Sequence, residues 1–223
     1  MRLADVLRTG LSIGVILSAG LCHSAQEPAK DARPGAVQGL PPRAAPTDYQ
    51  AQAQAGAVTI AADFVGHSVP TADGTLSTEE YVVVEAALFG AAGAKLQISP
   101  EDFSLRINGK KAPSPSKPYG LVASTLKDPL WAPPESQKQE KPKTSIGGGG
   151  QGDSGPPKEV KPPIELQRAW AQHTKMACLA SGERNLPQAG LLFFPHRGKV
   201  QNITALELIY AGAAGKASLT LQP

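Results

Sequence analysis

Cysteine is nearly absent from this chain of 223 residues, which contains only Cys22 and Cys178. Cys22 lies in an N-terminal segment with the pattern of a cleaved signal, so a single cysteine would remain after cleavage. One cysteine cannot form an intramolecular disulfide. The apolar core must therefore hold the fold together, even in an oxidising compartment.

Aromatic residues and clustered positive charge are also scarce. Phe, Trp and Tyr make up 5% of the chain, and the formal net charge is only +3 with the lysines scattered. Nucleic-acid interfaces gather basic residues on one face and often interleave them with aromatic side chains. The composition therefore excludes nucleic acid as an expected partner and argues against a stacking platform for bases or sugars.

No apolar run is long enough for a stable membrane anchor. The run over residues 11–21 is too short to span a bilayer. It follows Arg2 and Arg8 and precedes small residues at 24–25, which together form the pattern of a secretory signal. We predict a signal peptide over residues 1–25, and a periplasmic or extracellular mature protein without a transmembrane span.

A lipid anchor on Cys22 is the alternative to simple cleavage near Ala25. Lipoprotein signals carry a small residue just before the modified cysteine, whereas this chain has Leu21 there. The pattern therefore favours simple cleavage over lipidation.

Large apolar residues are sparse in two further segments. Residues 26–57 are rich in Pro, Ala and Gln, and residues 136–163 contain only Ile146 and Val160 among Gly, Pro and Lys. Such segments bury too little surface to offset the entropy lost on ordering. We predict a disordered tether over 26–57 and a disordered internal loop over 136–163.

The remaining sequence is rich in strand-like runs. These runs occupy residues 58–65, 81–90, 102–109, 189–195, 204–212 and 216–223. In one of them Phe103, Leu105 and Ile107 alternate with polar residues, which predicts a strand with one buried face. Residues 81–90 are almost continuously apolar except for Glu85, as expected for a central strand. Asn108-Gly109 predicts a tight turn with positive φ.

The pattern predicts one helix over residues 164–180, because prolines precede it and Gly182 follows it. A single helical turn is expected around residues 121–126. Each of the two ordered blocks would have only a marginal core on its own. We therefore predict a mainly β, single-domain sandwich of about six or seven strands over residues 58–223, interrupted by the internal loop.

The run Gly152-Asp153-Ser154-Gly155 is close to the sequence around the nucleophile of trypsin-like proteases. That chemistry needs a histidine base, an oriented aspartate and a rigid oxyanion hole. No apolar side chains surround Ser154 to hold it rigidly, and the preceding glycines lack the Gly-Lys-Ser/Thr of a phosphate-binding loop. We interpret the run as a linker and predict no catalytic and no cofactor-binding residues.

The histidines give no metal-binding pattern. His67, His173 and His196 are far apart, and none has a partner at ligand spacing. His173 on the predicted helix is interpreted as a packed, hydrogen-bonded residue. The thiol of Cys178 is expected to be buried, because free cysteine behaves as a small apolar residue.

Trp131 and Trp170 lie on either side of the internal loop, so they are able to meet across it. Packing in the core or under a lid is the favoured interpretation. The alternative is a small ligand-binding patch.

Three stretches resemble an uncharacterised group of exported bacterial proteins: YVVVEAALFGAAGAKLQISPEDFSLRING, GLVASTLKDPLW and ACLASGERNLPQAGLLFFPHRGKV. The likeness spans residues 58–131 and 164–223, although Ala180 departs from the turn usual in that group. The resemblance implies an immunoglobulin-like sandwich, similar to modules of exported lipoproteins, and brings no catalytic residues.

The function predicted from these features is that of a non-enzymatic binding or structural module of the cell envelope, whose partner is a protein or another envelope component. The alternative is an enzyme, such as a hydrolase, whose site is assembled from scattered residues. A deep pocket with converging titratable groups would favour the enzyme. A flat sandwich with one exposed apolar patch would favour binding.

Overall fold

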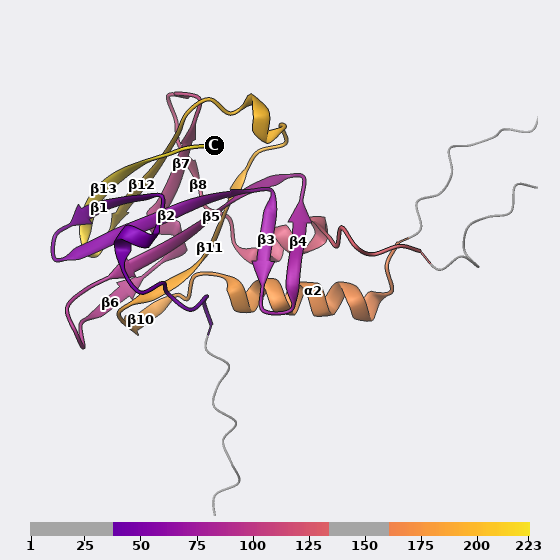
Figure 1. Ribbon diagram of the computed structural model, residues 1–223, viewed down its shortest axis with the longest axis horizontal. Helices are drawn as coiled ribbons and strands as arrows, with labels where there is room; N and C mark the ends of the chain where they lie inside the picture. Colours follow the sequence, from indigo (N-terminus) through magenta and orange to yellow (C-terminus); the bar gives the residue numbers. More distant parts are fainter. Residues whose placement is uncertain (1–37, 134–160) are drawn as a thin grey trace, which may run out of the picture. The chain divides into compact units, whose positions relative to one another are not determined.

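Two four-stranded antiparallel sheets form the centre of the structure, a computed structural model that describes residues 38–133 and 161–223 (Figure 1). The first sheet is ordered β1 (Ala51–Ala55), β2 (Val58–Gly66), β5 (Tyr81–Phe89) and β11 (Gln188–Pro195). The second is ordered β13 (Gly215–Leu221), β12 (Leu206–Gly212), β7 (Phe103–Ile107) and β8 (Ser114–Pro115). The predicted mainly β sandwich is confirmed.

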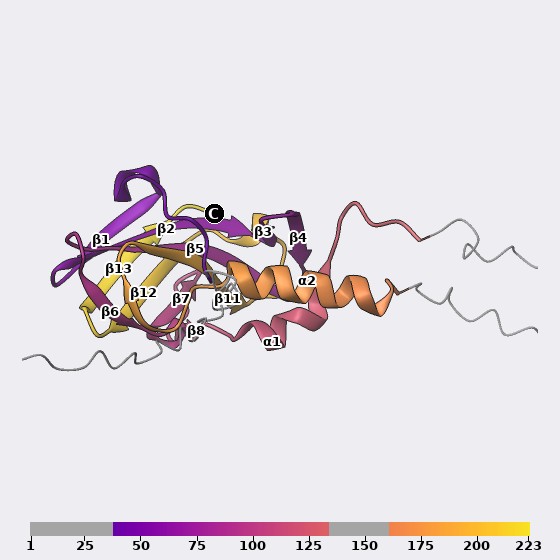
Figure 2. The same cartoon turned by 90° about the horizontal axis from the view of Figure 1, so that it is seen from below.

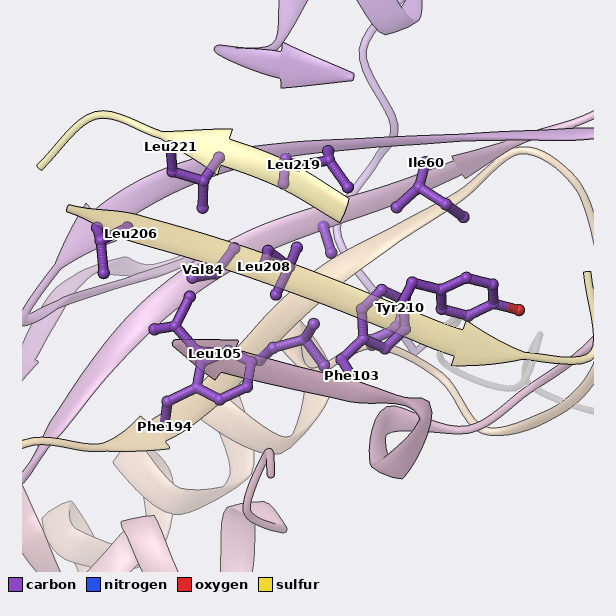
Figure 3. Close-up of a cluster of buried hydrophobic side chains, with 14 of the residues drawn as sticks. Ile60, Val84, Phe103, Leu105, Phe194, Leu206, Leu208, Tyr210, Leu219 and Leu221 are labelled. Atoms are coloured by element: carbon purple, nitrogen blue, oxygen red, sulfur yellow. The ribbon is translucent and has the colours of Figure 1, made fainter. Parts of the chain in front are cut away.

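One apolar core fills the space between these two sheets (Figure 3). Ile60, Val84 and Phe194 enter it from the first sheet, and Leu105 and Leu208 enter from the second. Successive side chains of a strand point to opposite faces, so alternate residues of each strand reach this core. The alternation predicted for residues 103–107 is confirmed, because the three apolar residues there are buried.

The outer face of the first sheet is covered as well, which explains the continuous apolar character of β5. Val83 and Phe193 point outwards, into a second apolar cluster, which we call the outer cluster. That cluster lies under α1 (Tyr119–Val122), α2 (Ile164–Ala177) and a small sheet of β3 (Ser68–Thr71), β4 (Gly74–Thr78) and β9 (Leu126–Lys127). Figure 2 shows α1 beside α2. Strands buried on both faces need apolar residues at every position.

The sandwich contains more strands than the six or seven predicted. The structure describes 13 strands, including the antiparallel pair β6 (Lys95–Ile98) and β10 (Gly182–Asn185). Short 3-10 turns complete the fold: η1 (Pro46–Asp48), η2 (Pro100–Asp102), η3 (Ala123–Thr125) and η5 (Val200–Asn202). The extra strands are short or polar, so they carry little hydrophobic pattern to detect. The predicted turn is confirmed, with φ of 52° at Asn108 and 67° at Gly109.

The main helix begins where the sequence indicates but ends at Ala177, three residues before the predicted end. Cys178 is extended, and the next backbone amide, of Leu179, donates to the carbonyl of Leu191 at 3.1 Å. The chain leaves the helix because it pairs with β11 at this point. Gly182 then has the positive φ of 95° at the start of β10.

The predicted disordered tether over 26–57 is wrong for residues 38–57, which form part of the fold; residues 26–37 lie outside the described residues. Leu40 pairs with Ala189, and Tyr49 is buried. The alternation of alanine and glutamine in β1 has the period of a strand, but the small side chains of alanine hide that pattern. The strand β1 is held by its backbone pairing with β2, so its alanines stabilise it although each buries little apolar surface.

The internal loop predicted over 136–163 lies outside the described residues, apart from its last three positions. On either side of it, strands from the two halves of the chain share both sheets, since β5 pairs with β11 and β7 pairs with β12. The predicted signal over 1–25, with Cys22, also lies outside the described residues. Of the helices that the structure describes, none is long and apolar enough to cross a membrane.

Candidate functional site: an aromatic groove

A hollow of about 370 Å³ lies where the first turns of α2 meet the segment that follows α1. We call it the aromatic groove. Its walls are formed by Ala123, Ser124, Leu126, Lys127, Asp128, Trp131, Lys161, Pro162, Gln167 and Trp170. Its volume lies at the lower end of the range of pockets that hold small ligands or single side-chain anchors.

Both tryptophans singled out in the sequence line this groove. Trp170 is only 6% exposed and packs with Leu126 in the outer apolar cluster, whereas Trp131 is partly buried against the same cluster. Trp131 and Trp170, which lie on either side of the internal loop in the sequence, therefore share one apolar cluster and line one groove. A buried and a half-buried indole give the groove one fixed wall and one accessible wall.

Local hydrogen bonds hold the two sides of the groove in place. The carboxylate of Asp128 accepts from the backbone amide of Leu130 at 2.8 Å, and the amide of Trp131 donates to the Asp128 carbonyl at 3.1 Å. On the other side, the Gln167 side chain donates to the carbonyl of Pro162 at 2.7 Å. These bonds fix the turn that carries Trp131 and the start of α2.

Large apolar side chains are exposed beside this groove. Within residues 38–133 and 161–223, the exposed large apolar residues are Leu121, Leu130 and Ile164, with exposures of 55%, 92% and 53%. Leu130 and Ile164 belong to the two segments that line the groove, and Leu121 lies on α1 just before the first of them. Their exposure does not follow from the hydrophobic pattern of the sequence, although the adjacent pair Leu130-Trp131 lies outside any strand or helix pattern and is a signal. Apolar residues gathered on a surface mark interaction sites more often than single ones do.

Titratable side chains converge at a second, more open hollow of about 420 Å³. It is lined by Glu80, Tyr81, Lys110, Pro195, His196 and Arg197. The carboxylate of Glu80 is already paired with the guanidinium of Arg197, at a nitrogen–oxygen distance of 2.9 Å. Burial lowers the pKa of His196, and the charges of His67 and Lys110 lower it further. Nε2 of His196 is inaccessible to solvent and has no hydrogen-bond partner, so it is not placed to act as a base there.

His67 lies next to this hollow, and its ring stacks on that of His196 with centroids 6.3 Å apart. Its Nδ1 is 2.7 Å from the carbonyl oxygen of Tyr81, and its Nε2 is 2.8 Å from that of Gly198. Both ring nitrogens of His67 are therefore engaged with the backbone. The geometry gives this histidine a structural role, linking the end of β2 to the segment after β11.

His173 is half-exposed on α2, and its Nδ1 lies 3.3 Å from a carboxylate oxygen of Asp73 in the turn between β3 and β4. This contact becomes an ion pair when the ring is protonated. In the part of the chain that the structure describes, no three His, Cys, Asp or Glu side chains come together to hold a metal ion. Ser154 and the glycines around it lie outside that part.

Cys178 is buried, as expected, and its thiol donates to the carbonyl of Thr174 at 3.1 Å. Burial raises the pKa of Cys178 to about 12. The reactive species is the thiolate, so at pH 8 this residue should have about two thousandfold less of it than a thiol with the ordinary pKa of about 8.5.

We therefore expect the folded chain from Gln26 onwards, which lacks Cys22, to resist iodoacetamide at pH 8 for hours. The same chain in concentrated guanidinium should be alkylated within minutes, with mass spectrometry as the measurement. Rapid stoichiometric alkylation of the folded chain would contradict the buried, protonated thiol.

Comparison of the chain with protein-family models, with curated proteins and with solved structures finds no match. The resemblance to exported bacterial proteins therefore stays a prediction, and the function must be argued from the aromatic groove itself.

Proposed function

We propose that this chain is a non-enzymatic binding module of the cell envelope and that the aromatic groove is its binding site. One observation carries the proposal. Leu121, Leu130 and Ile164, the large apolar side chains exposed in the described part of the chain, all lie in the segments around that groove.

The groove has the composition of a recognition site. Binding interfaces concentrate their free energy in a few central residues, and tryptophan is among the most frequent of these. Trp170 is held by the outer cluster and Trp131 by the turn at Asp128, so both are in place before a partner arrives. A site ordered in advance loses less entropy on binding than a flexible one.

A hydrolase has less support from the geometry. It needs a nucleophile within hydrogen-bond reach of a base. The side-chain hydroxyls that line the two hollows belong to Ser124 and Tyr81, and neither is hydrogen-bonded to a histidine or a carboxylate among the described residues. The groove is therefore better suited to holding a partner than to reacting with one.

Site-specific photo-crosslinking in the cells that naturally produce the chain tests this proposal. A photoreactive amino acid replaces Leu130 or Ile164 at the groove, or Gln52, which is exposed on β1 at the opposite end of the first sheet (Figure 1). We expect discrete crosslinked species from Leu130 and Ile164 but not from Gln52. Mass spectrometry of the crosslinked chain should place its first residue near Gln26, as the predicted signal requires.

Two results would contradict the proposal. The first is the same set of crosslinked species from all three positions, which indicates random collision. The second is the absence of any crosslinked species from the two groove positions in cells that contain the folded protein.

A further inference from the structure

The two segments that build the aromatic groove carry an excess of positive charge. Residues 117–133 and 161–177 contain five basic residues and two acidic ones. The basic residues are Lys117, Lys127, Lys161, Arg168 and Lys175, and the acidic ones are Asp128 and Glu165. The small sheet beside these segments adds Glu79, next to Lys127, and Asp73, next to His173, so the attraction for negative charge is centred on the ammonium groups that line the groove.

Two of these cations lie in the groove itself. Lys127 and Lys161 line it, together with Asp128, whose carboxylate is already engaged by the backbone amide of Leu130. Lys127 is 3.2 Å from a carboxylate oxygen of Glu79, but both side chains are more than half exposed. An exposed ion pair of this kind contributes little to stability, so a carboxylate of a partner can replace Glu79 at small cost.

The walls also offer hydrogen-bonding groups between the apolar ones. Ser124 and Gln167 line the groove beside Trp131 and Trp170. A peptide backbone can bond to a hydroxyl and an amide, whereas the hydrocarbon part of a lipid tail has no group to do so. The combination of indole rings, polar side chains and ammonium groups therefore suits a polypeptide better than a lipid tail.

On the basis of the proposed function, we infer that the aromatic groove takes a short acidic segment of a partner protein. That segment places one or two large apolar side chains against Trp131 and Trp170, and aspartate or glutamate against Lys127 and Lys161. The apolar anchors supply most of the binding free energy, and the charges supply orientation and selectivity.

Selection from a random library of displayed 12-residue peptides tests this chemistry. The full chain serves as bait. Peptides that also bind the double variant Trp131→Ala, Leu130→Ala are discarded, because they bind outside the groove. Circular dichroism first verifies that the variant is folded, because Trp131 packs partly against the apolar cluster, whereas Leu130 is 92% exposed. We expect enriched peptides that combine Phe, Leu, Ile or Trp with Asp or Glu, and few that carry Lys or Arg.

Charge reversal then measures the electrostatic contribution to peptide binding. The double variant Lys127→Glu, Lys161→Glu should bind a synthetic copy of an enriched peptide about tenfold more weakly, measured by fluorescence anisotropy at low salt. The control is Lys216→Glu on β13, which reverses the charge of one exposed lysine, against two in the test variant, and lies in the second sheet. That control should change the dissociation constant by less than about twofold.

Each remaining outcome overturns the inference. Basic or purely apolar enriched peptides, or equal affinity for the charge-reversed variant, exclude an acidic partner segment. Binding to phosphatidylglycerol vesicles without peptide enrichment points to a membrane surface instead. If crosslinking at Leu130 in cells succeeds while the library yields no acidic peptides, the binding function stands and only this assignment of the partner fails.

Discussion

Removal of residues 1–57 is expected to lower the melting temperature by at least about 10 °C, whereas removal of residues 1–37 is expected to leave the fold intact. Both truncations delete the predicted signal. Only the longer one deletes the segment over residues 38–57, which covers the outer face of the first sheet and supplies β1. The comparison therefore measures what this segment contributes to stability.

Arg43 is the first reason for the large effect. Its guanidinium lies 2.5 Å from a carboxylate oxygen of Asp63 on β2 and 3.2 Å from one of Glu85 on β5, where the Glu85 side chain is only 13% exposed. It also lies over the ring of Tyr49, 4.3 Å from the centroid. Without Arg43, two adjacent carboxylates remain on a largely covered sheet face with no positive charge to compensate them.

Tyr49 is the second reason. It is buried in a small apolar cluster with Ala61, Ala87 and Ala189, and its ring packs edge-on against Phe89 with centroids 5.9 Å apart. Loss of a buried aromatic side chain costs about 3–5 kcal/mol. The loss of Arg43 adds roughly 1–3 kcal/mol, discounted from the value for fully buried pairs because Arg43 is partly exposed.

The total approaches the 5–15 kcal/mol by which a typical domain is stable. A fall in Tm of at least about 10 °C is expected. Circular dichroism on heating provides the measurement, with the chain from Gln38 onwards as the control. Equal melting temperatures for the chains that begin at Gln38 and at Val58 would show that residues 38–57 do not belong to the stable fold.

Substitution of Gly190 by alanine is expected to destabilise the protein by about 3 kcal/mol or more. A Cβ at this position would lie 2.4 Å from both Cα and N of Leu179 and 2.7 Å from the carbonyl carbon of Cys178. These are backbone atoms, so no side-chain rotation relieves the overlap. They are held close because the Leu179 amide donates to the Leu191 carbonyl directly after α2.

Gly120→Ala is the matched control for Gly190→Ala. A Cβ at Gly120, in α1, has nothing within 4 Å, and its φ lies outside the left-handed region. Alanine favours helix over glycine by up to about 1 kcal/mol, so this change should be neutral or slightly stabilising. Guanidinium unfolding gives both free energies, and similar values for the two variants would refute the close approach of the two backbones at β11.

The strands were predictable wherever the pattern of apolar and polar residues was strong. Phe103, Leu105 and Ile107 alternate with polar residues, so their common burial follows from the geometry of any strand. The run over 81–90 predicted burial on both faces but not the elements that cover it. Those elements, α2 and the sheet of β3, β4 and β9, come from distant parts of the chain.

The ordering of residues 38–57 was not predictable in this way, because a segment's own composition reports only the surface that it can bury by itself. Arg43 and Tyr49 gain their partners from β2 and β5, and the small alanines of β1 gain theirs by pairing at the edge of a sheet. Such contacts depend on how the sheets are assembled.

The aromatic groove, too, was predictable only in part from the sequence. The scarcity of aromatics and the position of Trp131 and Trp170 around the internal loop were visible in the printed sequence. Their common wall, the exposure of Leu130 and the cations beside it exist only after α2 is laid over the first sheet. Local patterns report which faces a segment must bury, whereas a binding surface is what remains after distant segments have buried theirs.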